Sequence, residues 1–376
     1  MTILGIETSC DETAGAIVEG KNTHVELKAN ILATSLDLHA KTGGIIPEQA
    51  AREQVKYILP TIKEAIKTAN IKLTDIDAFA VTYGPGLIGS LLVGVETAKT
   101  LSFILNKPII PINHMVGHIY ANFIRENIKQ KTENKKSNLI PHTYSLIPTF
   151  PLLALVVSGG HTDLLLMKKH GDFHLLGGTR DDAAGECFDK CARLLGYPYP
   201  GGPKISQLAE KGNPKAFSFP RPMLGSGDYT FSFSGLKTAF LNATREHFPI
   251  LRTSNNTIGW QQIILDNNLS HKKEQLVYDL CASLQQAIIT VLVRKTLKAA
   301  REYSVKSILL SGGVSANQML RDTFEKEIDN QTIDAKLFFP PKNLCTDNAA
   351  MIASAAYFNF NPVPWKDITA NPELYF

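Results

Sequence analysis

Two histidines spaced four residues apart are the clearest candidates for chemistry. His114 and His118 stand in the segment His-Met-Val-Gly-His. On a helix, this spacing places both imidazoles on one face, where they can bind one metal ion; the alternative is two unrelated polar residues on a helix flank. A zinc protease would carry glutamate at position 115 to activate water, but this chain has Met115. The pair therefore predicts a metal site that lacks a protease's general base.

A metal ion would need a third ligand, and Asp347 is the best candidate. It stands in the polar turn Cys-Thr-Asp-Asn, ahead of a run of small residues that predicts a helix. A carboxylate completes many metal sites that contain two histidines. The alternative role for Asp347 is the N-cap of that helix, because an aspartate side chain accepts hydrogen bonds from the first backbone amides. The pattern leaves both roles open.

Three glycine turns could bind phosphate. They are Ser158-Gly159-Gly160, Pro200-Gly201-Gly202-Pro203 and Ser311-Gly312-Gly313. Such turns leave backbone N–H groups open to an anion, above all near a helix start. One turn is weak evidence because glycine is an ordinary turn residue, but three in one α/β chain indicate nucleotide binding. The P-loop motif and the dinucleotide-binding motif are both absent from the sequence.

Two groups of acidic residues could bind polar substrates. Asp11 and Glu12 form the first group, in an N-terminal turn. The second group consists of Asp181, Asp182, Glu186 and Asp189. Asp182 is the expected cap of a helix, and the plain alternative is a capped helix with a solvated acidic face. The functional interpretation is the binding of ribose hydroxyls or an amine, with one carboxylate as proton acceptor.

The elements that must position these residues alternate between strands and helices. Strands are predicted at 3–8, 14–18, 76–82, 152–157, 162–167 and 309–311, and helices at 47–69, 89–105, 183–196, 204–211, 235–247 and 274–303. The helix at 47–69 carries Val55, Ile58, Leu59, Ile62 and Ile66 on one stripe. This stripe is expected to face the core.

Two patterns occur twice in the same order. A strand, a polar turn and a second strand at 3–18 are repeated at 152–167, and a strand, a glycine turn and a helix at 81–105 are repeated from 309 onward. The repeats predict a duplicated α/β lobe. A nucleotide would bind in the cleft between the two copies.

Length and composition agree with two lobes. The chain has 376 residues, of which 44% are hydrophobic and 20% charged, so global disorder is excluded. A net charge of +4 does not by itself indicate nucleic-acid binding. Five scattered cysteines predict free thiols in a reducing cytosol. We expect a cytoplasmic protein, because the sequence shows neither a targeting segment nor a run of eighteen apolar residues.

The domain boundaries follow from these patterns. We predict a first lobe at 1–126, completed by a C-terminal helix at about 347–376, and a second lobe at 151–346. A lysine-rich flexible insertion at 127–150 separates the lobes; it could touch RNA phosphate but is more simply a solvated loop. A second insertion is expected near 248–273.

The motifs together resemble those of a known family. They are Ile6-Glu7-Thr8-Ser9-Cys10-Asp11-Glu12-Thr13, His114-x-x-x-His118, Val157-Ser158-Gly159-Gly160-His161-Thr162, Asp182-x-x-Gly185-Glu186-x-Phe188-Asp189-Lys190, Tyr199-Pro200-Gly201-Gly202-Pro203, Phe231-Ser232-Phe233-Ser234-Gly235-Leu236-Lys237, Gly312-Gly313-Val314-x-x-Asn317 and Cys345-Thr346-Asp347-Asn348. In this order they resemble the bacterial tRNA adenosine threonylcarbamoyltransferase family, over nearly the whole chain. The two insertions are departures that leave the motifs intact, but they put any partner and tRNA contacts made there in doubt.

The resemblance implies a fold and an activity. The family has the duplicated actin/Hsp70-like ATPase (ASKHA) fold, with two lobes around a nucleotide and metal cleft. Its members are acyltransferases: they transfer the threonylcarbamoyl group of threonylcarbamoyl-AMP to N6 of the adenosine at position 37 of tRNAs that read codons beginning with A. The alternatives are a metal-dependent endopeptidase, a small-molecule kinase of the same fold and a non-catalytic scaffold.

The resemblance also implies site residues and partners. His114, His118 and Asp347 would hold one divalent metal ion, Fe²⁺ in the first place and Zn²⁺ as the alternative. The residues implied to bind the adenylate are Val156, Val157, Ser158, Gly159, Gly160, Asp189, Gly202 and Asn317. Asp11 or Glu12 is our candidate proton acceptor. The implied partners are tRNA, a paralogous protein of the same fold (TsaB-like) and a small ATPase (TsaE-like), with no membrane.

Overall fold

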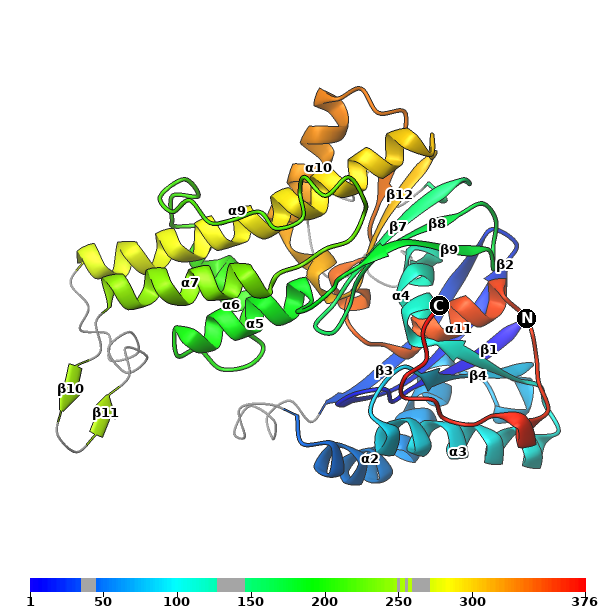
Figure 1. Cartoon of the computed structure of the whole chain (residues 1–376). Coiled ribbons are helices and arrows are strands. Elements are labelled where there is room, and N and C mark those ends of the chain that lie inside the picture. Colours follow the sequence, from blue (N-terminus) through cyan, green and yellow to red (C-terminus); the bar gives the residue numbers. More distant parts are fainter. Residues whose placement is uncertain (35–44, 127–145, 249–250, 254–255, 259–270) are drawn as a thin grey trace, which may run out of the picture.

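Two α/β lobes lie side by side in the computed structural model of the chain (Figure 1). The structure describes residues 1–34, 45–126, 146–248, 251–253, 256–258 and 271–376. Each lobe is built on one mixed sheet, and the sheets have helices on both faces.

The first lobe contains a sheet in the order β5-β4-β1-β2-β3-β6. Its strands are β1 (Thr2–Glu7), β2 (Glu12–Lys21), β3 (His24–Thr34), β4 (Ala78–Gly84), β5 (Ile109–Asn113) and β6 (Ile124–Glu126). Strands β1, β2 and β3 pair antiparallel, whereas β4 is parallel to both β1 and β5. Most side chains of β1 and β4 are apolar and are buried on both faces, as expected for strands covered by helices; Glu7 and Thr82 are buried polar exceptions.

The second lobe repeats this topology in the order β13-β12-β7-β8-β9. Its strands are β7 (Leu152–Val157), β8 (Thr162–Met167), β9 (Phe173–Gly178), β12 (Ser307–Ser311) and β13 (Lys336–Phe338). Again the first three strands are antiparallel and the last two are parallel to β7 and to each other. The repeated order confirms the predicted duplicated α/β fold.

The register places the polar turns of both lobes at equivalent positions. Glu7 pairs with Ala14 at the end of β1, and Val157 pairs with Thr162 at the end of β7. The turns between these pairs contain Asp11 in one lobe and the glycines 159–160 in the other. The duplication therefore puts two sets of polar groups at matching edges of the two sheets.

Helices divide the core into three layers. The outer face of the first sheet is covered by α2 (Pro47–Ala69) and α3 (Ile88–Leu105). Between the sheets, α4 (His114–Tyr120) and α11 (Ala349–Phe358) share one buried cluster with strands of both lobes. The outer face of the second sheet packs against α5 (Ala184–Leu194), α6 (Gly201–Ala209), α7 (Ser234–His247), α9 (His271–Glu302) and α10 (Gln318–Asn330). The two elements that supply the candidate metal ligands are thus at the centre of the molecule.

Some predicted features differ from the structure. The stripe assigned to α2 is only partly buried: Ile58 and Ile62 face the core, but Val55 and Leu59 are 64% and 62% exposed. Only one side of this 23-residue helix packs on the sheet, so the stripe that contains Val55 and Leu59 faces away from the core. The C-terminal helix ends at Phe358, and the residues after it form a tail without a further α-helix.

The two predicted insertions lie largely outside the described residues. Residues 127–145 of the first are not described, and 146–150 run up to β7, where the Thr149 amide donates to Ser307 Oγ over 2.9 Å. Within the second, residues 251–253 and 256–258 form the short antiparallel pair β10 (Leu251–Thr253) and β11 (Asn256–Ile258), and residues 271–273 belong to α9.

Within the part of the chain that the structure describes, two helices are long and apolar enough to cross a membrane by length and composition alone. In α9, 72% of the most apolar window is buried inside the protein, as in a core helix. In α3 the corresponding share is 33%, because one side packs on the first sheet and the other is exposed. All five cysteines are free thiols.

Candidate metal and nucleotide site

The helix that carries both histidines begins directly at the end of a strand. Asn113, the last residue of β5, caps α4 because its Oδ1 accepts hydrogen bonds from the backbone amides of Met115 (2.8 Å) and Val116 (3.4 Å). Residues 114 and 118 then face the same side of the helix, as their spacing predicts. Met115 is buried in the core, so it offers no group to this site.

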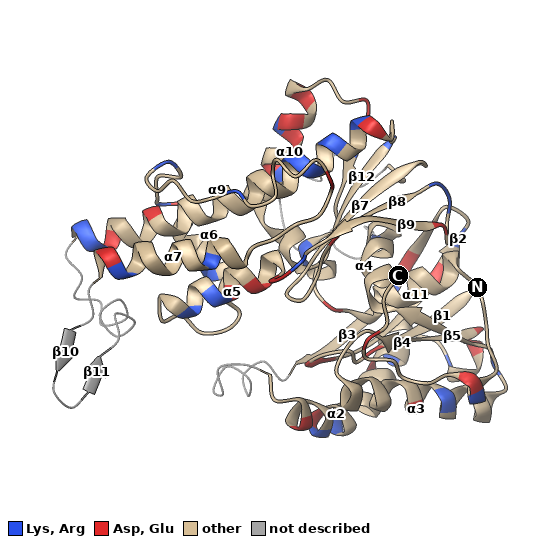
Figure 2. Cartoon of the chain, viewed as in Figure 1, with Lys and Arg blue, Asp and Glu red and all other residues tan. Residues whose placement is uncertain are grey.

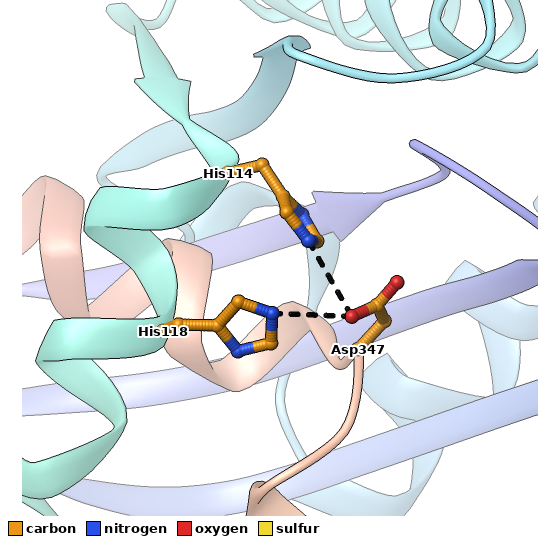
Figure 3. A group of neighbouring side chains, drawn as sticks. All are labelled: His114, His118 and Asp347. Atoms are coloured by element: carbon orange, nitrogen blue, oxygen red, sulfur yellow. Dashed lines mark ion pairs between the residues drawn. The ribbon is translucent and has the colours of Figure 1, made fainter. Parts of the chain in front are cut away.

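Asp347 meets the two histidines from the other side (Figure 3). Its Oδ1 atom lies 3.4 Å from His114 Nε2 and 3.3 Å from His118 Nε2. The cap of α11 is the neighbouring Asn348, whose Oδ1 accepts from the Met351 amide over 2.9 Å. Asp347 is therefore not the N-cap, and its carboxylate is free to act as a ligand.

The geometry and chemistry of the three side chains fit a metal ion. One ligand atom from each lies within 4.8 Å of the others. A tetrahedral ion with bonds of about 2.1 Å holds its ligand atoms roughly 3.4 Å apart. His118 is fully buried; its Nε2 lies 3.3 Å from Asp347 Oδ1 without regular hydrogen-bond geometry, and its Nδ1 has no hydrogen-bond partner within the described chain. A buried imidazole without such a partner is costly unless a ligand satisfies it, so the site suits a metal ion with nitrogen and oxygen ligands.

Glu7 orients one of these histidines. Its Oε2 atom lies 3.1 Å from His114 Nδ1, and the Ser9 hydroxyl lies 3.2 Å from the same nitrogen. The fully buried carboxylate is held by the Thr82 hydroxyl (2.5 Å) and the Ser9 amide (2.6 Å). A proton on His114 Nδ1 can thus be donated to Glu7, which leaves Nε2 with its lone pair toward the metal position.

Electrostatics hold two of the three groups in the state that binds a metal, whereas His114 must give up a proton when a metal binds. Burial alone would lower the pKa of His114, but Asp347 and Glu7 raise it well above its ordinary value. Burial lowers the pKa of His118, and the adjacent His114 lowers it further. Although burial opposes ionisation of Asp347, the two imidazoles hold its pKa well below the ordinary range. The carboxylate is therefore ionised and His118 neutral, which are the states that bind a metal.

The acidic pair of the first turn lies beside the same site. Burial, the charge of Asp347 and a hydrogen bond with Asp11 raise the pKa of Glu12 well above its ordinary value. Burial also raises the pKa of the Cys10 thiol, to which Asp347 and Asp11 contribute. Glu12 is thus the carboxyl group here that binds a proton most readily near neutral pH.

The first glycine turn presents an open backbone beside the metal ligands. The side chains of Val156 and Val157 are buried in the core, so only their backbone can reach a ligand. Beyond them, the Ser158 amide donates to the His161 carbonyl over 2.9 Å and closes the turn. A Cβ placed on Gly159 or Gly160 would meet no atom within 4 Å. The open space above these glycines is where a phosphate could approach the amides.

A second predicted phosphate-binding turn does not have open amides. The amides of Gly201 and Gly202 donate to Asp189 Oδ1 over 2.7 and 3.1 Å, because α6 begins at Gly201 rather than at 204. Burial raises the pKa of Asp189, while these amides lower it. Asp189 is therefore bound to Gly202 at the start of α6. A ligand could contact Asp189 Oδ2, or approach Gly202 where it has no side chain.

Two further sequence-predicted roles are resolved by the structure. The predicted cap Asp182 is not the N-cap of α5; that position is Ala183, and Asp182 forms ion pairs with Lys190 (2.9 Å) and Lys237 (3.1 Å). Asn317 does cap a helix, since its Oδ1 accepts from the Leu320 amide. Its Nδ2 donates to Ser206 Oγ and Gln285 Oε1, so both ends of the amide are engaged with the protein.

Sequence reasoning missed four groups around the site. Glu7 is one, and its signal is a single carboxylate at the end of an otherwise apolar strand. His161 is another: burial and the two histidine ligands lower its pKa to about 4. Burial together with Asp11 and Asp189 raises the pKa of Tyr199, which lies between the acidic pair and α6. Arg321 is the fourth: it is buried and contacts Cys345 Sγ at 3.3 Å, two residues before Asp347.

Comparisons with known proteins agree with this fold and identify the family. HypF from T. kodakarensis superposes with a TM-score of 0.57 over 96% of this chain at 14% identity; the chain spans 47% of that structure, and the likeness concerns the fold alone. The model of the tRNA N6-adenosine threonylcarbamoyltransferase family matches residues 26–132 and 137–354. Proteins with that name are 47% identical over 361 residues in Bacillus subtilis (96% of this chain, 91% of theirs) and 48% identical over 358 residues in Thermomicrobium roseum (95% and 92%). The chain therefore belongs to the tRNA N6-adenosine threonylcarbamoyltransferase family.

Proposed function

We propose that this enzyme transfers the threonylcarbamoyl group of threonylcarbamoyl-AMP to N6 of the adenosine at position 37 in tRNAs that read codons beginning with A. In this reaction N6 attacks the carbamoyl carbon, the bond from that carbon to the phosphate oxygen breaks, AMP leaves and N6 loses one proton. One observation supports the chemistry above all others: His114, His118 and Asp347 converge within 4.8 Å of one another in a chain of this family.

Different residues of the chain are proposed to bind the metal ion, the phosphate, and the ribose and base. A metal ion held by His114, His118 and Asp347 would supply a positive charge that polarises acyl and phosphate oxygens; Fe²⁺ is the proposed ion and Zn²⁺ the alternative, and both suit two imidazoles and one carboxylate. The backbone of 156–160 would bind the phosphate. Asp189, through its second carboxylate oxygen, and Gly202 would contact the ribose, and Asn317 would exchange one of its present protein contacts for the base. Elemental analysis of protein purified without oxygen tests the identity of the ion.

Glu12 is the proposed proton acceptor, in preference to Asp11. Its raised pKa makes the Glu12 carboxylate a stronger base than an ordinary carboxylate, and the negative charge of Asp347 contributes to that rise. We expect Glu12→Gln to lower the rate of transfer about 10²–10⁴-fold, the usual effect of losing a general base, and Asp11→Asn to lower it less. An Asp11→Ala/Glu12→Ala variant that transfers at the wild-type rate would reject both candidates.

The decisive assay combines threonylcarbamoyl-AMP, a tRNA transcript and the expected helper proteins, with threonylcarbamoylated adenosine measured by mass spectrometry. Wild-type protein should produce it, and His114→Ala should not. A protease is disfavoured because Met115 replaces the glutamate that would activate water and is itself buried. ATP turnover with a small acceptor and without tRNA would favour the kinase alternative, and full activity of His114→Ala would favour a scaffold.

An exposed apolar face of the first lobe is the proposed contact with a paralogous partner. Residues of α2 and α3 line a groove of about 470 Å³, among them Val55, Ile88 and Val93. Leu59, Leu92, Phe103 and Ile104 extend the apolar surface along the same helices and are exposed. Apolar surfaces of this kind mark protein interfaces, and a partner of the same fold could present its own equivalent helices.

Partner binding predicts a sharp effect of a charge on this face. Leu59→Asp should abolish co-elution with the paralogous partner, because the charge would have to be buried without a counter-ion. Glu64→Lys is the control and should co-elute normally, because Glu64 is on the same helix but pairs with Lys67 and does not line the groove. Analytical gel filtration measures both; normal co-elution of Leu59→Asp would place the partner elsewhere.

Sharing tRNA between several proteins would explain the modest charge of this chain. In Figure 2, Lys and Arg are spread over both lobes and interspersed with Asp and Glu rather than gathered in one patch. We also propose a cytoplasmic location without a membrane, which the five free thiols support. A small ATPase remains part of the proposed assembly.

A further inference from the structure

A buried arginine lies behind the site with no role in the proposed chemistry. Arg321, on α10, is only 5% exposed. Its Nε donates to the Ser315 carbonyl over 2.6 Å, and its Nη2 donates to the Pro340 carbonyl over 3.1 Å and contacts Cys345 Sγ at 3.3 Å. The guanidinium also lies over the Phe339 ring, 4.1 Å from its centroid. A charged side chain in the interior is thus held by carbonyls, a thiol and a ring.

These contacts join two segments that both reach the site. Ser315 belongs to the short turn Gly313–Ala316, which follows the third glycine turn and ends at Asn317. Pro340 and Cys345 flank the turn Lys342–Leu344, and Asp347 follows two residues after Cys345. The guanidinium therefore bridges the segment implied in adenylate binding and the segment that carries a metal ligand.

The same two segments also touch each other directly. A Cβ on Gly313 would lie 3.8 Å from the Thr346 methyl group, which is ordinary contact. Gly312 has a φ of +83°, and a Cβ added to it would lie only 2.5 Å from the Val157 carbonyl oxygen. Gly312 therefore packs directly against the end of β7. The segments at 156–160, 312–317 and 345–347 form one packed unit, with Arg321 on its inner side.

We propose that Arg321 is a positioning residue that fixes the Asp347 segment against the 312–317 segment and so couples metal binding to adenylate binding. Arginine suits this role because its planar fork offers several donors in a fixed geometry, whereas the single ammonium of lysine does not. The proposal rests on the proposed function in assigning a metal ion to His114, His118 and Asp347 and the adenylate to the 312–317 segment.

Binding of a metal and a nucleotide, without any reaction, tests the proposal. Zn²⁺ alone and AMP alone are titrated into metal-free protein, and Zn²⁺ is titrated again at saturating AMP. In the wild type we expect AMP to change the Zn²⁺ dissociation constant at least about fivefold, at the lower end of usual couplings between sites. Arg321→Lys should weaken Zn²⁺ about 10–100-fold, as loss of a supporting contact does, and should bring the coupling factor close to one.

Lys295→Met supplies a matched control. Lys295, on α9 of the second lobe, is also a buried cation and is 2% exposed. Its Nζ donates to Ser226 Oγ and to the Asp228 carbonyl, both over 3.0 Å, and contacts none of the three metal ligands. Its loss should lower the unfolding temperature and leave Zn²⁺ affinity and the coupling factor unchanged. A purely structural role for Arg321 would give this same pattern and would overturn the proposal.

A second variant covers the case in which Arg321→Lys does not fold. Cys345→Ala keeps the arginine but removes its sulfur contact, together with the contacts of the thiol with the Pro340 and Pro341 carbonyls (3.6 and 3.4 Å). It should weaken Zn²⁺ less than Arg321→Lys does and give a coupling factor between that variant's and the wild type's; wild-type values for both would overturn the proposal. Because these titrations use neither tRNA nor threonylcarbamoyl-AMP, their failure is distinguishable from failure of the transfer assay.

Discussion

At the scale of single residues, a carboxylate that does not bind the metal decides how one ligand points. His114 can rotate about its side-chain bonds, and either ring nitrogen could face Asp347. Glu7 and Ser9 approach Nδ1 at 3.1 and 3.2 Å, which leaves Nε2 toward Asp347. Fixing the ring before the metal arrives removes an entropic cost from binding.

Replacing this carboxylate should weaken metal binding while preserving the three ligands. We expect Glu7→Gln to raise the Zn²⁺ dissociation constant about 10–100-fold, the usual effect of removing a histidine's carboxylate partner. Isothermal titration of metal-free protein measures this change. Glu19→Gln is the control, because Glu19 pairs with Lys21 and Lys28 on the exposed side of β2 and should bind Zn²⁺ normally. Equal affinities for the two variants would show that Glu7 does not orient the ligand.

The sequence predicts these residues unequally well. The histidine pair is found because four-residue spacing on a helix is a local rule, and Asp347 because a small-residue helix follows it. Glu7 is not found, because its importance depends on β4 and α4, which lie far along the chain. The predicted cap Asp182 is wrong, since two lysines from α5 and α7 compete for its carboxylate.

At the scale of elements, close packing of α11 on β1 sets the position of Asp347. A Cβ on Gly5 would lie 2.2 Å from the Ala349 carbonyl oxygen and 3.0 Å from Ala353 Cβ. Only glycine at this point of β1 lets the helix come so near. Asp347 precedes the helix by two residues, so the height of α11 above the sheet determines where its carboxylate meets the histidines.

A methyl group at this position should disturb both fold and site. We expect Gly5→Ala to lower the free energy of unfolding by about 1–3 kcal/mol, the usual cost of overpacking a core, and to weaken Zn²⁺ binding because α11 must shift. Urea unfolding and Zn²⁺ titration measure the two effects. Gly235→Ala provides the control, because a Cβ on Gly235 would meet no atom within 4 Å and Gly235 lies near the start of α7, in the second lobe. Wild-type Zn²⁺ affinity in a destabilised Gly5→Ala protein would separate the two effects and contradict the link.

Elements were predictable where one strong local pattern dominates. The bounds of α2, β7 and β8 agree with the prediction, because each has either a proline start or a continuous apolar run. Strand β9 was missed: it is the edge strand of its sheet, and His174 and Leu175 on it are exposed, so no alternating pattern marks it. The orientation of α2 was predicted only in part, because an interface stripe and a core stripe are alike in sequence.

At the scale of the whole molecule, the C-terminal tail connects the two lobes. The Asn371 amide donates to the Tyr83 carbonyl on β4 over 2.7 Å, in the first lobe. Four residues later the Tyr375 hydroxyl donates to Asp163 Oδ1 over 2.7 Å, on β8 of the second lobe. Together with the shared cluster around α4 and α11, the tail makes the relative placement of the lobes part of one cooperative structure.

The tail ends on a buried carboxylate, and this gives the fold a pH dependence. Asp163 is 2% exposed, and its Oδ2 has no hydrogen-bond partner within the described chain. Burial raises the pKa of Asp163, although the Tyr375 hydroxyl opposes this. In the unfolded chain the pKa would be about 3.9. The folded state therefore binds the proton more tightly, so this group favours folding at low pH and loses that effect as pH rises through its raised pKa.

Removing the charge should abolish this dependence. Asp163→Asn keeps an oxygen that can accept from Tyr375 but has no ionised form, so we expect the variant to exceed the wild type in free energy of unfolding at pH 7. The difference should shrink as the pH falls through the raised pKa of Asp163 and should level off below the unfolded-state pKa of about 3.9. Urea unfolding at several pH values measures it, and Tyr375→Phe should change stability in the opposite direction at pH 7, by about 1–3 kcal/mol, because a buried carboxylate loses its donor. A difference between Asp163→Asn and the wild type that stays constant from pH 7 to pH 4 would show that Asp163 is not the titrating group.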